Sequence, residues 1–143
     1  MPTADSYQEA IRRTLTLRSE APPDASAVAE ATLQTWHRMA DELVPVIGSH
    51  GADVLFGRSL YITSIHFPWL AIVGEHRNST AQLANLKARL ADRETDTAAE
   101  ASYTLLVTFV ELLISLIGES LTERLLAPVW VQRLPASEQE SET

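Results

Sequence analysis

Carboxylates and histidines are the side chains of this sequence whose spacing could support acid–base chemistry. Glu111 and Glu119 lie on one polar stripe of a predicted helix, which would place two carboxylates near each other. His37 and Asp41 are four residues apart and would share a helical face. Enzymes use such pairs to transfer protons. An enzyme built on Glu111/Glu119 or on His37/Asp41 is the third of the functions that we consider.

Other catalytic and metal-binding patterns are missing from the sequence. There is no cysteine, which excludes thiolate zinc sites, iron–sulfur clusters and thiol nucleophiles. The five glycines form no phosphate-binding loop, and no Gly-x-Ser-x-Gly elbow occurs. A di-iron bundle site needs Glu-x-x-His pairs, but the residues three before His37 and His66 are Gln34 and Thr63. We therefore assign no catalytic residue, no metal ligand and no cofactor.

Four ring-bearing side chains are candidates for a ligand pocket. An aromatic pocket between helices could hold a flat or apolar ligand, such as a haem-like molecule. The other interpretation is that these side chains fill the core of a small bundle, because a small domain buries its large side chains anyway. The candidates are Trp36, Tyr61, His66 and Trp69.

Charge and hydropathy limit the partners. The chain of 143 residues has a formal net charge of −8, so we expect no nucleic-acid partner and repulsion from anionic lipid. The first five residues lack the basic start of a signal peptide. The longest apolar run, residues 103–118, is about 16 residues and contains Glu111, whereas a spanning helix needs about 20. These features predict a cytoplasmic protein with no membrane span.

Apolar periodicity predicts helices. A short amphipathic helix in residues 1–25 is followed by a helix that begins with Ser26 as N-cap and ends near Ile47. Pro45 should kink or end that helix in its last turn, and residues 48–51 form a turn. Further helices are expected over 52–66, from about 78–80 to 94, and from 97 to about 126. The apolar seam of the first core helix consists of Ala29, Leu33, Trp36, Ala40, Leu43 and Ile47.

The expected helix over 97–126 is apolar on most of its surface. A helix of this kind is either central to its bundle or shared with a second chain. One apolar face should be covered by the rest of the chain, and a second face should need a partner. This second face predicts a homodimer, unless the first 25 residues fold back to cover it. The interface candidates are Leu105, Phe109, Leu112 and Leu116.

These elements predict an all-α fold. Residues 1–25 form an N-terminal arm, residues 26–134 a bundle of about four main helices, and residues 135–143 a disordered acidic tail. No internal repeat and no second domain are evident. The expected architecture is a single helical bundle.

Two segments carry a resemblance to known proteins. Residues 43–60, which begin Leu-Val-Pro-Val-Ile-Gly, and residues 116–130, which begin Leu-Ile-Gly-Glu, resemble small helical bacterial proteins of uncharacterised role. The resemblance implies an association with signal-transduction genes. The leading interpretation is a non-enzymatic protein–protein interaction module: a homodimeric adaptor or regulatory protein in bacterial signalling that binds itself and another signalling protein. The alternative is a sensor domain that binds a small apolar or haem-like ligand between its helices.

Overall fold

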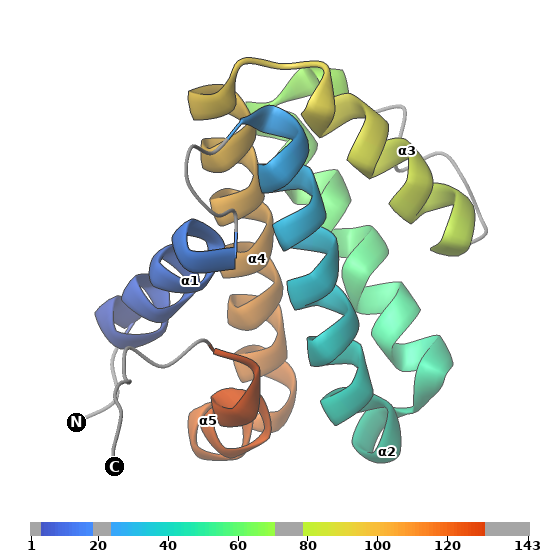
Figure 1. Cartoon of the computed structure of the whole chain (residues 1–143). Helices are drawn as coiled ribbons and strands as arrows, with labels where there is room; N and C mark the ends of the chain where they lie inside the picture. Colours follow the sequence, from blue (N-terminus) through green and yellow to red (C-terminus); the bar gives the residue numbers. More distant parts are fainter. Residues whose placement is uncertain (1–3, 19–23, 71–78, 131–143) are drawn as a thin grey trace, which may run out of the picture.

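The computed structural model describes residues 4–18, 24–70 and 79–130, and every regular element in these ranges is helical (Figure 1). The predicted all-α class is confirmed. The predicted tail, residues 135–143, lies outside the described residues. The elements are α1 (Ala4–Arg18), α2 (Ala25–His66), η1 (Pro68–Leu70), α3 (Ser79–Ala91), α4 (Thr95–Ile117), α5 (Glu119–Leu126) and η3 (Ala127–Val129).

Helix α2 is a helical hairpin. Gly48 has φ 82° and ψ 160°, a backbone conformation that interrupts the helix. Residues 49–66 then run back beside residues 25–47 (Figure 1). The break lies within the turn that the sequence predicts, three residues after Pro45, which itself remains helical. Trp36 and Phe56 join the two segments, with ring centroids 4.4 Å apart.

The beginning of α2 differs from the sequence prediction. The N-cap is Asp24, not Ser26, and a side-chain oxygen of Asp24 accepts a hydrogen bond from the Ala27 backbone N–H at 2.7 Å. A carboxylate at this position satisfies a free N–H of the first turn and interacts favourably with the helix dipole. Ser26 is therefore the second helical residue and is exposed to solvent.

The predicted single helix over 97–126 is wrong, because Gly118 divides it. Gly118 has φ 92° and ψ 158°, and α5 leaves the direction of α4 at this residue (Figure 1). The backbone N–H of Gly118 donates to the Ile114 oxygen, which completes the last turn of α4. The Gly118 oxygen accepts hydrogen bonds from both the backbone N–H and the side-chain hydroxyl of Thr122. These bonds begin α5 as a separate helix.

Helix α4 occupies the middle of the bundle, between α1 on one side and α2 on the other (Figure 1). Its central residues 101–110 are all buried or half-buried. Helix α1, the described part of the predicted N-terminal arm, packs against both α2 and α4. The buried side chains of α1 are Ala10, Ile11, Thr14 and Leu15.

Helix α3 packs chiefly on α2. Leu86 and Leu90 are buried, and Leu83 is half-buried, so one apolar side of α3 faces the bundle. On the surface, Lys87 Nζ lies 2.7 Å from Glu30 Oε1. This hydrogen-bonded ion pair lowers the pKa of Glu30.

By length and composition, α4 is a candidate membrane span. Its 23 residues include a window of mean hydropathy 1.6. The helix begins at Thr95 and is therefore longer than the apolar run of residues 103–118 that the sequence shows. The bundle buries 39% of this window, and Leu116 is the large apolar side chain of α4 that is mostly exposed. The exposed residues of α4 are Asp96, Glu100, Glu111, Ser115 and Leu116, four of which are polar. This distribution is typical of the core helix of a bundle.

Candidate functional site

The four predicted pocket side chains do not come together. Trp36 is in the core, stacked on Phe56 and edge-on to Phe109 with ring centroids 5.0 Å apart. Tyr61 is 68% exposed on the outer face of α2. Trp36 and Tyr61, one from each segment of the α2 hairpin, therefore do not line a common pocket.

The other two candidates lie near the end of α2. His66 is exposed, and Trp69 in η1 is half-buried. The Trp69 ring contacts Phe67 edge-on, and the guanidinium of Arg93 lies 4.6 Å from its centroid. Trp69 therefore helps to attach η1 to the turn that follows α3, which is a structural role.

The predicted dimer face is divided between core and surface. Leu105 and Phe109 are each 1% exposed, because the chain itself covers them. This removes the reason for placing these two side chains at an interface. Leu112 is half-buried, and Leu116 is 60% exposed near the end of α4. Of the four residues, only Leu116 presents most of its surface to solvent.

The two candidate acid–base pairs lie on the surface. Glu111 is on α4 and Glu119 on α5, so the kink at Gly118 separates them, and both are exposed. His37 and Asp41 are exposed on α2. Catalytic pairs normally lie in clefts that hold a substrate. Among the described residues, no three His, Asp or Glu side chains lie close enough together to hold a metal ion.

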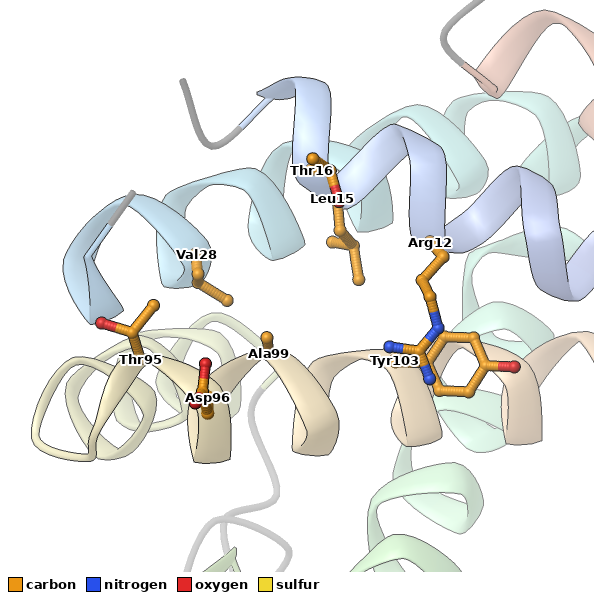
Figure 2. Close-up of a pocket in the computed structure, with 8 residues that line it drawn as sticks. All are labelled: Arg12, Leu15, Thr16, Val28, Thr95, Asp96, Ala99 and Tyr103. Atoms are coloured by element: carbon orange, nitrogen blue, oxygen red, sulfur yellow. The ribbon is translucent and has the colours of Figure 1, made fainter. Parts of the chain in front are cut away.

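A pocket of about 180 Å³ lies where α1, the start of α2 and the start of α4 meet (Figure 2). Leu15, Val28 and Ala99 point toward its centre from three helices. Thr16, Thr95 and Asp96 also line it, while Arg12 and Tyr103 close one end. Pockets that hold drug-sized ligands measure about 300–1,000 Å³. This pocket is therefore too small for a haem-like molecule.

Arg12 closes the pocket by holding α1 to α4. Its Nη2 atom lies 3.2 Å from Glu100 Oε2, and its guanidinium carbon lies 3.8 Å from the centroid of the Tyr103 ring. The hydrogen bond to Glu100 raises the pKa of Arg12, and desolvation offsets part of this increase. Because its charge is already paired, Arg12 acts as a connection between helices rather than as a free ligand-binding group.

The outer face of residues 49–66 exposes large apolar side chains in a regular pattern. Val54, Tyr61 and Ile65 are 53%, 68% and 64% exposed, and Arg58 is exposed between them. Their spacing of 4, 3 and 4 residues places all four on one side of the helix. We call Val54, Arg58, Tyr61 and Ile65 the α2 stripe.

Sequence reasoning assigned the apolar members of the α2 stripe to the helix without identifying them as a surface. Residues 54–65 are apolar in so many positions that periodicity does not show which side faces the core. Arg58 is the available signal, because a charged side chain usually marks the outer face of a helix. Residues at helical spacing from Arg58 are Val54, Tyr61 and Ile65.

Comparisons with known protein families, with curated proteins and with solved structures found no match to this chain. The chemistry of the chain's own surface is therefore the basis on which a function is proposed.

Proposed function

We propose that this chain is a non-enzymatic protein–protein interaction module whose binding surface is the α2 stripe. The single observation that carries the proposal is the exposure of Val54, Tyr61 and Ile65 on one helical face. Fully burying a side chain of this size contributes about 1.5–3 kcal/mol of free energy. Because these side chains are more than half exposed, a partner that covered them would gain a large part of that free energy. Exposed apolar side chains gathered on one face are typical of interaction sites.

The chemistry of the stripe also resembles that of known interface centres. Tyrosine and arginine are enriched among the residues that contribute most to binding. Arg58 makes no ion pair or hydrogen bond with the part of the chain that is described. It is therefore available to a partner. An adaptor or regulatory role would follow from a surface that binds protein and carries out no reaction.

Site-specific photo-crosslinking in the producing cell tests the proposal. A benzophenone amino acid placed at Tyr61 should form adducts with a protein, whereas the same group at His37, an exposed position on the polar face of residues 25–47, should not. Adding Ile65→Glu should abolish the Tyr61 adduct, because a carboxylate would be desolvated in the contact. Equal adducts from both positions, or none from Tyr61, would contradict the proposal.

A further inference from the structure

We infer that the partner of the α2 stripe is a second copy of this chain, bound in antiparallel orientation. This inference rests on the proposed function and adds the identity and the register of the partner. The contact pairs Val54 of each copy with the partner's Ile65, and Arg58 of each copy with the partner's Tyr61.

The spacing of the α2 stripe allows it to pair with itself about a two-fold axis. Val54, Arg58, Tyr61 and Ile65 are separated by 4, 3 and 4 residues, a pattern that reads the same in both directions. A two-fold axis requires each surface to match itself, so that residue i meets residue j and residue j meets residue i. An axis between Arg58 and Tyr61 brings together positions 54 and 65, and positions 58 and 61.

The side chains that this axis pairs are chemically complementary. In this register an aliphatic side chain meets an aliphatic side chain, and a guanidinium meets an aromatic ring. A cation over the face of an aromatic ring is attracted by the ring's quadrupole. A parallel arrangement would instead place Arg58 against the partner's Arg58, which brings two like charges together. Charge complementarity therefore selects the antiparallel arrangement.

Contacts between a guanidinium and an aromatic ring also join elements within the chain. Arg12 lies over Tyr103 to join α1 and α4, and Arg93, in the turn after α3, lies over Trp69 of η1. Exposed Arg58 and Tyr61 have the groups to form this contact between copies. Gly57, between Val54 and Arg58 in the helix, leaves open space where its side chain would be. The partner's Tyr61 ring can approach the backbone there.

The size of the surface indicates how tight the dimer should be. The stripe is about 17 Å long, from the rise of 11 helical residues. A stable complex buries about 800 Å² on each partner, which is more than one stripe of this length provides. We therefore expect a dimer that forms at micromolar concentrations and dissociates on dilution.

The oligomeric state of the full chain and of two matched variants is the first test. Sedimentation equilibrium should show a concentration-dependent dimer of the natural chain. Ile65→Glu should raise the dissociation constant by about tenfold or more. Leu116→Glu replaces a side chain of the same size and exposure, 60% against 64%, and should leave the dimer unchanged. Circular dichroism confirms that both variants are folded.

Disulfide trapping is the second test. Because the chain has no cysteine, only the introduced cysteines can form a disulfide. A disulfide requires two Cα atoms about 4–7 Å apart. In the antiparallel register, Val54→Cys chains should crosslink with Ile65→Cys chains. Neither variant should crosslink with itself, because identical positions are then about 17 Å apart along the helix. Self-crosslinking of each variant without the mixed product would overturn the register.

A natural chain that stays monomeric at high micromolar concentration would overturn the inference. So would a dimer that Leu116→Glu disrupts and Ile65→Glu does not. If the chain is monomeric but the Tyr61 crosslinker captures another protein, the proposed function stands and the second copy is ruled out. If Tyr61 captures nothing, the proposed function fails as well.

Discussion

Gly48 and Gly118 have the same backbone conformation, and each separates two helices at the same end of the bundle (Figure 1). The pattern of exposed and buried residues around the two glycines is also the same. Two positions before each glycine an apolar side chain is exposed, Val46 in one case and Leu116 in the other. Four positions after each glycine the side chain is buried, as Ala52 and Thr122 show. The fold thus uses one type of helix–glycine–helix turn twice.

Replacing either turn glycine by alanine should destabilise the chain. No atom lies within 4 Å of an added Cβ at Gly118, so the cost comes from the backbone conformation and not from a clash. Conformations of this kind cost a residue with a side chain about 1–3 kcal/mol. Gly118→Ala should lower the free energy of unfolding in urea by that amount.

Gly57→Ala is the control for this prediction, because Gly57 is helical and also has open space at its Cβ position. There alanine should raise the free energy of unfolding by up to about 1 kcal/mol, since glycine is a poor helix former. Both variants are compared at low protein concentration, so that pairing of copies does not contribute. Equal effects of the two substitutions would show that the positive φ of Gly118 is not the cause.

Trp36→Ala should be among the most destabilising substitutions in the chain. The ring is buried between Phe56 and Phe109, and truncation of a buried tryptophan costs about 3–5 kcal/mol. Tyr61→Ala removes an exposed ring and should change the free energy of unfolding of the monomer by no more than about 0.5 kcal/mol. Chemical denaturation of both variants measures the difference. A small effect of Trp36→Ala would contradict the packing of the hairpin.

Trp36 and Tyr61 differ in how well their burial can be predicted from the sequence. Polar residues on the opposite face of residues 26–47 indicate which side is inward. The predicted seam lies on the inner side, where three of its six residues are buried and three are half-buried. Residues 52–66 and 101–117 are apolar on too many sides for periodicity to separate inside from outside. For Tyr61 the available signal is the charged Arg58, three residues before it on the same face, and the packing of the hairpin confirms that this face is exposed.

Two of the four residues of the candidate dimer face are buried for a related reason. Leu105 and Phe109 are buried because other helices of the same chain cover α4. Helix α1 lies about 90 residues before this part of α4, and no local pattern reports a contact over that separation. The prediction of one helix over 97–126 was wrong at Gly118, since a positive φ leaves no mark in the sequence beyond the glycine itself.

Thr63→Val should stabilise the chain. The Thr63 hydroxyl is fully buried and has no hydrogen-bond partner among the described residues. Removing an unsatisfied buried hydroxyl without changing the shape of the side chain should raise the free energy of unfolding by about 1 kcal/mol. Thr35→Val is the matched control, because the equally buried Thr35 hydroxyl donates to the Ala31 oxygen at 2.8 Å. There the same substitution should destabilise, and thermal melts of both variants would show opposite shifts.

The Glu30–Lys87 pair should make a small, pH-dependent contribution to stability. Because the ion pair lowers the folded-state pKa of Glu30 below its usual value of 4.5, its contribution is complete above that pH. The contribution is lost as the pH falls through the lowered pKa. Both side chains are about half exposed, so the pair is worth no more than about 0.5–1 kcal/mol. The difference in unfolding free energy between the natural chain and Glu30→Gln should shrink in acid and in high salt.

Helix α1 should be held to the bundle by its apolar side chains more than by its ion pair. Ile11 is fully buried, and Ile11→Ala should cost about 2–5 kcal/mol through the lost burial and the cavity that remains. The ion pair of Arg12 with Glu100 joins two side chains that are each about half exposed, so Arg12→Ala should cost about 1–2 kcal/mol at most, the contact with Tyr103 included. Hydrogen exchange of the amides in α1 separates the two contributions. Exchange should increase strongly in Ile11→Ala and only slightly in Arg12→Ala, and the reverse order would show that the ion pair holds α1 in place.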